Sequence, residues 1–402
     1  MRRKFIAFTL SAFILLSFSG CNSGNIYLDH IEIDRLELIQ TIGFDFDEGL
    51  ITATASSGIN QNTDTPAIIS DSAKTSALAV KAIQNYAEKK HLFFSHTENI
   101  LIGFDAAKSS LSEIIDYIKR DIDTRLDISL FILKSERADE IIFGSSGKNS
   151  SVTDILNSIK KDAPTMSDGY VFSFGEIASS LAYNGCAVIS AIKSDEKKTF
   201  NSENSDFSLT PVGYAVIKND RLAGFLDKDS SKGVNLLMHK AETDYVALSD
   251  GHGGLATLKV TPKKTKISPV YKDDKLSEIK IDITLSANIE ELSSDIDIAD
   301  HEFLSLIKTE LSQTEASYIL NAVNASQNMS ADFMNLEKKL QLSAPLKFNV
   351  SREEWNEIFP SLKITVAVSS DIERTYDIGS RLNGRERNDT LWMKIIKYLQ
   401  NN

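Results

Sequence analysis

The chain has 402 residues and a formal net charge of −12, with 42% hydrophobic and 25% charged residues. This composition is ordinary for a globular protein, and the length predicts two or three domains. An acidic chain repels phosphate backbones and anionic lipid headgroups, so we expect no nucleic-acid binding. After the amino-terminal segment, no apolar run reaches the length of about eighteen residues that a membrane span requires. Nothing in that part of the chain is therefore expected to cross a bilayer.

The amino-terminal segment has the plan of a secretory signal. Arg2, Arg3 and Lys4 form a basic head, and residues 5–18 carry no charge. This apolar run is shorter than the roughly twenty residues that span a bilayer, and small residues follow it, as they do before a signal-peptide cleavage site. Residues 1–20 are therefore expected to be a signal peptide that is removed.

The cysteine after this segment is the principal candidate site residue. Ser19-Gly20-Cys21 resembles the lipobox of bacterial lipoproteins, in which the cysteine takes a diacylglyceryl group and becomes the new amino terminus. Phe18 stands where a leucine is usual. Because two acyl chains anchor a protein stably whereas one is marginal, we expect acylated Cys21 to hold the mature chain on the outer face of a membrane.

The alternative interpretation is a plain secretion signal, with Cys21 in a disulfide. The chain has one other cysteine, Cys186, inside the apolar stretch 185–192, which predicts a buried strand. A buried thiol behaves as a small hydrophobe, and the polar residues that follow Cys21 are unsuited to packing beside it. Removal of residues 1–20 takes three positive charges away and changes the formal charge from −12 to −15.

Strand and helix patterns alternate in the first half of the mature chain. Residues 36–46 and 50–56 flank Asp47-Glu48-Gly49 and predict a hairpin, whereas the polar residues 58–72 predict a flexible loop. Further elements are expected in this order: a helix at 74–90, a strand at 99–103, a helix at 106–120, a strand at 127–133, a linker at 145–151, helices around Asp154 and Glu176 that end at Gly185, and a strand from Cys186. The alternation predicts an α/β domain, residues 21–195, in which helices cover a sheet.

A charged stretch, residues 194–208, has few apolar residues and marks a domain boundary. After it, residues 212–217 and 221–226 predict a hairpin around Asn219-Asp220. A helical stretch up to Met238 and several strands follow. Together these elements predict a middle domain, residues 205–270.

The remaining residues predict a third domain. Residues 276–287 alternate as a half-buried strand does, and two helical stretches follow at 301–326 and around 333–340. A capped short helix then begins after Ser351 and ends at Pro360, before another strand. These elements predict a C-terminal α/β domain, residues 271–380. Residues 384–402 predict an extra amphipathic helix.

Two groups of residues contain side chains that could in principle bind a metal ion. Asp45, Asp47 and Glu48 invite a calcium interpretation, but an EF-hand loop has its glycine sixth and a glutamate twelfth, and Gly49 comes fifth. His91 and His96 are five residues apart, a spacing that points the two side chains to opposite sides of a strand. We therefore expect no metal site in either place.

Three other groups are better explained by structure than by ligand binding. Residues 249–254 resemble a phosphate cradle but precede a strand rather than a helix, so a turn is expected. Arg120 and Arg125 could clamp a carboxylate ligand, although ion pairs within the chain are favoured. Trp355 and Phe359 are four residues apart on a short helix, a spacing that places both on one face, and we expect them to pack in the core.

Several short motifs stand in a fixed order behind the lipobox cysteine. They are Ile42-Gly43-Phe44-Asp45, Ser95-His96-Thr97 before Ile100-Leu101-Ile102-Gly103, Arg120-Asp121-Ile122-Asp123-Thr124-Arg125, the hairpin from Gly213 to Gly224, and Trp355-Asn356-Glu357-Ile358-Phe359-Pro360. In this order they resemble the Ger(x)C family of spore germination lipoproteins, the C subunits of nutrient germinant receptors. Ser95 replaces the usual glycine, Ser330-Ala331-Asp332-Phe333 lacks the glycine-rich run that usually follows it, and residues 384–402 extend past the family's normal end.

The resemblance implies a mixed α+β fold of three domains, with mixed sheets covered by helices. It also implies a subunit without known catalytic activity or cofactor, held outside the spore's inner membrane, that acts with two integral membrane subunits in nutrient sensing. A small-molecule ligand is left open.

Two other functions remain as alternatives. One is an extracytoplasmic solute-binding lipoprotein, which would bind a small molecule tightly on its own. The other is an envelope enzyme, which would need clustered titrating groups in a deep pocket. The sequence contains no Gly-x-Ser-x-Gly elbow, zinc-ligand spacing or Walker loop, so an enzyme is not expected.

Overall fold

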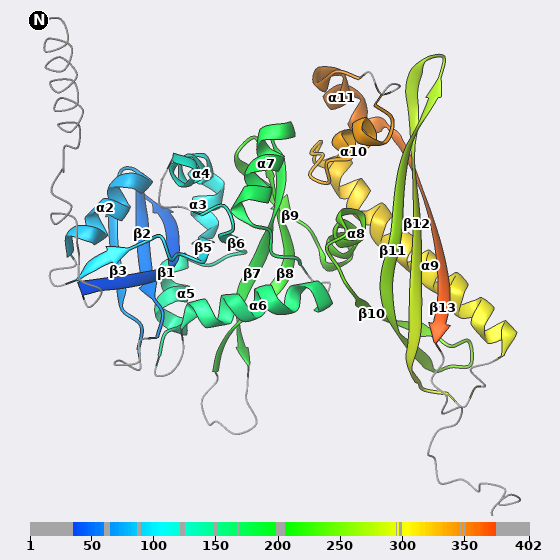
Figure 1. Ribbon diagram of the computed structural model, residues 1–402, viewed down its shortest axis with the longest axis horizontal. Helices are drawn as coiled ribbons and strands as arrows, with labels where there is room; N and C mark the ends of the chain where they lie inside the picture. Colours follow the sequence, from blue (N-terminus) through cyan, green and yellow to red (C-terminus); the bar gives the residue numbers. More distant parts are fainter. Residues whose placement is uncertain are drawn as a thin grey trace, which may run out of the picture.

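A computed structural model describes residues 35–59, 65–86, 90–120, 125–147, 151–166, 169–197, 206–294, 296, 300–345, 348 and 350–374. The predicted signal peptide (1–20), Cys21 and the predicted extra helix (384–402) lie outside these residues. The described elements form two sheets that lie at opposite ends of an elongated molecule, with helices between and around them (Figure 1).

Nine described strands form the first sheet, in the order β3-β2-β1-β5-β6-β7-β8-β9, with β4 beside the start of β1. They are β1 (Leu36–Asp47), β2 (Leu50–Ser57), β3 (Ile68–Ala73), β4 (His91–Phe93), β5 (Asn99–Ile102), β6 (Ser129–Leu133), β7 (Cys186–Lys197), β8 (Asp206–Lys218) and β9 (Arg221–Phe225). The central strands β1, β5, β6 and β7 are parallel, and antiparallel strands flank them on both sides. The sheet is therefore mixed.

Helices cover both faces of this sheet. They are α2 (Ser76–Tyr86), α3 (Phe104–Ser109), α4 (Leu111–Arg120), α5 (Ala138–Ser145), α6 (Val152–Met166) and α7 (Phe174–Asn184). Along β6, Leu130 and Ile132 belong to the same apolar cluster as buried residues of α2, α3, α4 and α7, whereas Phe131 and Leu133 belong to a separate cluster with buried residues of α5 and α6. Successive side chains of a strand point to opposite faces, so a continuous apolar strand such as β6 must be covered on both sides.

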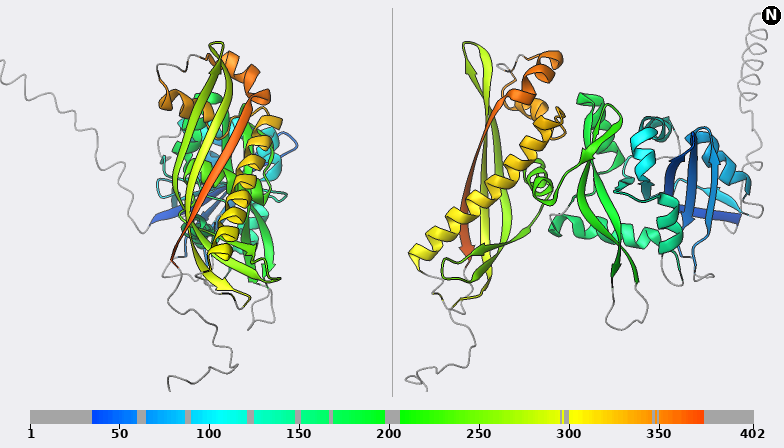
Figure 2. Two further views of the ribbon diagram at one scale, coloured as in Figure 1. Left: turned by 90° about the vertical axis from the view of Figure 1, so that its right-hand side faces the viewer. Right: turned by 180° about the vertical axis from the view of Figure 1, so that it is seen from behind.

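The second sheet has the order β10-β11-β12-β13. Its strands are β10 (Asp244–Ser249), β11 (Leu255–Lys272), β12 (Lys275–Leu292) and β13 (Lys363–Arg374), and its helices are α8 (Lys228–Met238), α9 (His301–Asn328), α10 (Leu336–Ser343), α11 (Arg352–Ile358) and the 3-10 turn η3 (Phe359–Ser361). The long helix α9 runs along this sheet, and α8 lies on the side that faces the first sheet (Figure 2). The mixed α+β class is confirmed.

Most of the expected elements are present, and both expected hairpins are confirmed as β1–β2 and β8–β9. The expectation of a loop at 58–72 was wrong in its second part, because β3 starts at Ile68 and pairs with β2. Ser70 and Ser72 hydrogen-bond with Thr54 and Thr52 at 2.8 Å each. A polar strand of this kind has the composition of a loop.

Two helices also differ from expectation. The helix expected at 106–120 is divided into α3 and α4 at Ser110, whose backbone leaves the helical region at φ −134° and whose N–H bonds to Ala106. Helix α5 was not expected, because its first residues follow directly from a strand and a turn. It is held in place by a residue 93 positions earlier in the chain.

The strands of the predicted middle domain, residues 205–270, are divided between the two sheets. Within this segment β8 and β9 pair in the first sheet, whereas β10 and β11 pair in the second. The charged stretch 194–208 also contributes ends of β7 and β8, which pair with each other. The division into three domains therefore stays a prediction about folding units, and its boundaries do not coincide with those of the two sheets.

Candidate functional site

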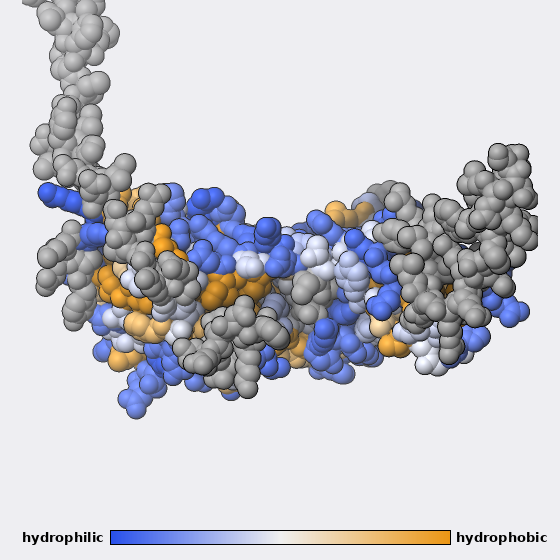
Figure 3. Space-filling view, turned by 90° about the horizontal axis from the view of Figure 1, so that it is seen from below, coloured by the Kyte–Doolittle hydropathy of each residue, from blue (hydrophilic) through white to orange (hydrophobic). Residues whose placement is uncertain are grey.

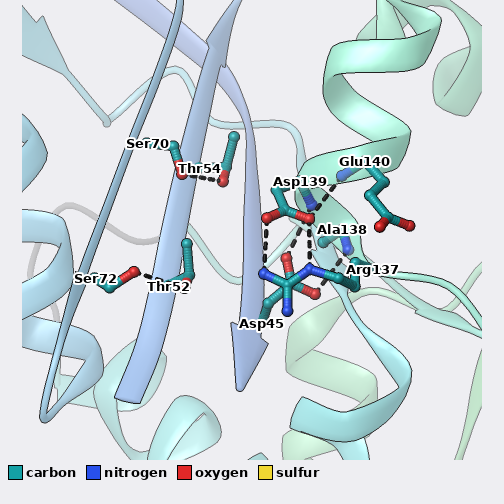
Figure 4. Close-up of polar contacts among 9 residues, drawn as sticks. All are labelled: Asp45, Thr52, Thr54, Ser70, Ser72, Arg137, Ala138, Asp139 and Glu140. Atoms are coloured by element: carbon teal, nitrogen blue, oxygen red, sulfur yellow. Dashed lines mark hydrogen bonds and ion pairs between the residues drawn. The ribbon is translucent and has the colours of Figure 1, made fainter. Parts of the chain in front are cut away.

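The acidic cluster that invited a calcium interpretation contains a helix anchor. Asp45 lies at the end of β1, and its carboxylate accepts the backbone N–H groups of Ala138 at 2.8 Å and Asp139 at 2.9 Å, at the start of α5 (Figure 4). Burial raises the pKa of Asp45 to about 6, although these two hydrogen bonds oppose the shift. Arg137 in turn binds Asp139 through two hydrogen bonds of 3.0 and 2.7 Å. A negative group at a helix N-terminus is stabilising, so the role of Asp45 here is structural.

Two glycines of the family motifs make room for this anchor. A Cβ on Gly103 would collide with the Asp45 carboxylate, and a Cβ on Gly43 would lie 2.9 Å from the Cβ of Ala138. The carboxyl ends of parallel strands often bind ligands in α/β sheets. At the end of β1 that place is filled by the chain's own Asp45.

The candidate histidines and arginines are not brought together. His91 is exposed in β4, and the His96 ring lies against Phe93, with centroids 5.6 Å apart. Arg120 pairs with Asp116 at 2.8 Å and Arg125 with Asp127 at 2.6 Å, all on the surface. These pairs agree with the favoured interpretation of ion pairs within the chain. Over the residues that the structure describes, no group of three or more His, Cys, Asp or Glu side chains could hold a metal ion.

The expected turn at 249–254 is confirmed. The carboxylate of Asp250 accepts the backbone N–H groups of His252 at 2.9 Å and Gly254 at 2.8 Å, which closes the turn before β11. Gly251 and Gly253 both have positive φ angles. Two of the backbone N–H groups that a phosphate would need are therefore used by Asp250.

The packing role expected of Trp355 and Phe359 is also confirmed. Their rings stack with centroids 5.2 Å apart, and Trp355 is 1% exposed. Gln327 of α9 donates to the backbone carbonyls of Phe359 and Leu362 at 2.9 and 2.7 Å. These bonds attach α11 and η3 to α9 just before β13 begins.

Cys186 lies in β7 as expected, where burial raises the pKa of its thiol to about 11. Within the described part of the chain it forms no disulfide. The same part of the chain contains no helix that is long and apolar enough to span a membrane.

A second buried anchor joins the two sheets. The carboxylate of Asp332 accepts the backbone N–H groups of Leu336 at 2.8 Å and Glu337 at 2.9 Å, at the start of α10. The Asp332 carbonyl accepts the side-chain amide of Asn184 at 2.7 Å, from the end of α7. Burial raises the pKa of Asp332 to about 7, against the effect of the two backbone hydrogen bonds. Asp332 belongs to the motif 330–333, which was the available signal for this site.

Lys339 and Asn335 extend this contact. The Lys339 ammonium donates to the carbonyl of Leu237 at 2.8 Å, near the end of α8, and burial lowers the pKa of Lys339 to about 8. The Asn335 side chain donates to the hydroxyl of Ser180 in α7 at 2.9 Å. Helix α10 is thus bonded to α7 on the first sheet and to α8 beside the second.

The hairpin β8–β9, which carries a family motif, contacts the same region. The buried hydroxyl of Tyr214 bonds to the side chain of Asn235 in α8 and accepts the N–H of Tyr170 at 2.6 Å. Lys218 donates to the carbonyl of Met329, after α9, at 3.1 Å. Gly213 has φ +96°, and a Cβ there would collide with the side chain of Ser231 in α8. We call the contact of α7, α8, α10 and the β8–β9 hairpin the junction.

An open hollow of about 520 Å³ lies at the junction. It is lined by Leu126, Asp127, Ser173, Gly175, Glu176, Ser179, Ser180, Asn335 and Lys338. Many of these groups already have partners, because Glu176 pairs with Lys240 at 2.6 Å and caps α7 together with Ser173. The lining comes from three separate parts of the chain, so no local sequence pattern could have indicated it.

A second hollow, of about 510 Å³, lies between α6 and β8 and has a largely apolar lining. It includes Ile155, Ile159, Ala163, Phe207, Leu209 and Pro211. The face seen from below carries apolar side chains gathered over the first sheet and its helices, whereas much of the remainder is hydrophilic (Figure 3). Phe143 of α5 is 53% exposed. Neither hollow contains the buried anchors Asp45 and Asp332.

Comparison with known proteins identifies the family. A model described as "Spore germination protein N-terminal domain" matches residues 29–194, and one described as "Spore germination B3/ GerAC like, C-terminal" matches residues 212–376. The chain belongs to the Ger(x)C family of spore germination proteins. This family consists of germinant receptor subunits and is not a known enzyme family. The expected resemblance is confirmed.

Two individual proteins agree with this assignment. YfkR of Bacillus subtilis (strain 168), a protein named for spore germination, is 22% identical over 283 residues, which cover 70% of this chain and 71% of YfkR. The crystal structure of the GerBC protein matches with a TM-score of 0.55 at 16% sequence identity. The match covers 83% of this chain and 97% of the GerBC chain. At this identity the GerBC match supports the Ger(x)C fold alone.

Proposed function

We propose that this Ger(x)C chain is the lipid-anchored subunit of a nutrient germinant receptor. It is attached through acylated Cys21 to the outer face of the spore inner membrane and acts there with two integral membrane subunits. The observation that carries the proposal is the match to both family domains, over residues 29–194 and 212–376, behind a lipobox-like cysteine.

The described titrating groups favour contact with partner proteins over catalysis. Asp45 and Asp332 have strongly raised pKa values, but each carboxylate is bonded to two backbone N–H groups at a helix start. Perturbed groups indicate an active site when they face a cleft, and these two are used to hold helices. A lipid tether would raise the effective concentration of the chain toward membrane-embedded partners without any new contact.

Lipid attachment is tested by labelling cells with radioactive palmitate and separating membranes from soluble protein. The wild type should be labelled and sediment with membranes, and Cys21→Ala should lose the label and be unprocessed or released. The matched control is Cys186→Ala, which removes the buried cysteine and should keep both label and location. Labelling of Cys21→Ala as efficient as that of the wild type would rule out this site.

Partner binding is tested by isolating the tagged chain from detergent-solubilised spore membranes. Two integral membrane proteins should be isolated together with the wild type. Isolation of the chain alone, combined with tight binding of a nutrient by the purified chain, would instead favour the solute-binding lipoprotein.

A further inference from the structure

One buried acidic side chain has no role in the anchors described above. Glu315 lies in the middle of α9 and is 1% exposed. Neither of its carboxyl oxygens has a hydrogen-bond partner. An ionised carboxylate without partners is very costly to bury, so such a group keeps its proton instead.

The charged groups that act on Glu315 come from two other elements. Lys232 of α8 and Asp244 of β10 form a buried ion pair at 2.7 Å, with side chains 9% and 8% exposed. On α9 itself, the ring of Tyr318 lies 5.3 Å from the Lys232 ammonium. One ammonium group therefore stands near two carboxyl groups. Burial and the charge of Asp244 raise the pKa of Glu315 to about 8, although Lys232 opposes the shift.

Most of helix α8 is buried, so it has no solvent-exposed face that could accommodate a new charge. Its residues 230–237 are all buried. On one side, a Cβ on Gly233 would collide with the Tyr318 carbonyl, so α8 and α9 are in close backbone contact. On the other side, Asn235 bonds to Tyr214 of the first sheet. A change in the α8–α9 contact therefore reaches the junction directly.

We infer that Glu315 is a proton-operated switch of the contact between α8, α9 and β10. With a neutral Glu315, Lys232 pairs with Asp244 and the helices pack as observed. With an ionised Glu315, two carboxylates compete for Lys232, and one buried negative charge is left without a partner. The α8–α9 contact then loosens, and with it the junction. This inference is independent of lipid anchoring and of the partner subunits.

The test is hydrogen–deuterium exchange of the full-length chain in detergent, followed in α8 and α9 as a function of pH. Rates are divided by those of unstructured peptides at the same pH. Opening that exposes Glu315 to water releases its proton, because its ordinary pKa is 4.5. Linkage then requires the opening constant of α8 to rise up to about tenfold per pH unit below pH 8 and to level off above it.

Two variants make this test specific. Glu315→Gln keeps the shape of the neutral side chain and should abolish the pH dependence of α8 opening. Glu310→Gln, five residues earlier on α9, makes the same substitution at a partly exposed position and should behave like the wild type. The inference is overturned if wild-type α8 shows no pH dependence, or if Glu315→Gln retains it.

Infrared spectroscopy gives a second readout that does not depend on opening. At pH 6 the wild type should show the C=O stretch of one protonated carboxyl that is absent from Glu315→Gln, and this band should disappear as the pH passes about 8. If Glu315→Gln does not fold, loss of such a band near pH 8 from Asp332→Asn, which lacks the other carboxyl that titrates close to this pH, supports the inference. Absence of any protonated carboxyl band at pH 7.5 overturns it.

Discussion

Asp45 and Asp332 have the same task in two places. Each carboxylate lies at the start of a helix and accepts two backbone N–H groups that have no partner within that helix. Each also joins elements that are distant in the chain or belong to different sheets. The motifs 42–45 and 330–333 that point to the Ger(x)C family are thus explained by packing and helix capping.

Trp355 is expected to be the most sensitive single position in the second sheet and its helices. Its ring is buried against Phe359 and Phe348, so Trp355→Ala leaves a large cavity and should lower the free energy of unfolding by about 3 to 5 kcal/mol. Urea unfolding measures this change. Leu342→Ala, at a position 74% exposed, is the control and should change stability little. An unchanged unfolding midpoint for Trp355→Ala would refute the packing role.

At the scale of elements, the position of α5 depends on the lack of a side chain at Gly103. Gly103→Ala should push Asp45 away from the start of α5 and cost about 1 to 3 kcal/mol, as overpacking does. The control is Gly144→Ala in the last turn of α5, where a Cβ meets Phe207 at an ordinary 3.5 Å. It should be neutral or slightly stabilising, since alanine favours helices. Equal stability of Gly103→Ala and the wild type would show that this close approach is not required.

Local patterns predicted the elements that bury one regular face. The hairpins β1–β2 and β8–β9 and the helix α9 followed from turn residues and apolar periodicity. Strand β3 was missed because it is polar, with its serine hydroxyls bonded to threonine hydroxyls on β2. Helix α5 was missed because its cap comes from Asp45. The junction could not be predicted from local patterns, because its bonds join α7, α8 and α10 across 102 to 155 residues.

For the whole molecule, three buried carboxyls determine how stability depends on pH. Their folded pKa values are about 6 for Asp45, 7 for Asp332 and 8 for Glu315, all above the ordinary values of 3.8 to 4.5. Through these groups the folded chain binds more protons than the unfolded chain between pH 5.5 and 7. Its free energy of unfolding should fall across this range by at least about 1.4 kcal/mol per pH unit. The lowered pKa values of His239 and Lys339 act in the opposite direction, but Lys339 keeps its proton over most of this range. Carboxylates with lowered pKa values, such as Asp371, titrate below this range.

Urea unfolding at a series of pH values measures this slope. Asp332→Asn should reduce it, because one of the three groups no longer titrates. Asp371→Asn removes an exposed carboxylate whose pKa is lowered by Lys308, and it should leave the slope between pH 5.5 and 7 as in the wild type. Stability that increases steadily from pH 5.5 to 7 would contradict the raised pKa values of the buried carboxyls.

The central claim is that this Ger(x)C chain works through contacts made while tethered to a receptor in the membrane. The most direct measurement is the germination of spores that lack the chain, with each nutrient tested separately and with a trigger that acts downstream of the receptor. We predict loss of the response to particular nutrients, a normal response to the downstream trigger, and a weakened nutrient response in spores that carry Cys21→Ala. Normal germination of the deletion strain with every nutrient that acts through the partner subunits would contradict the claim.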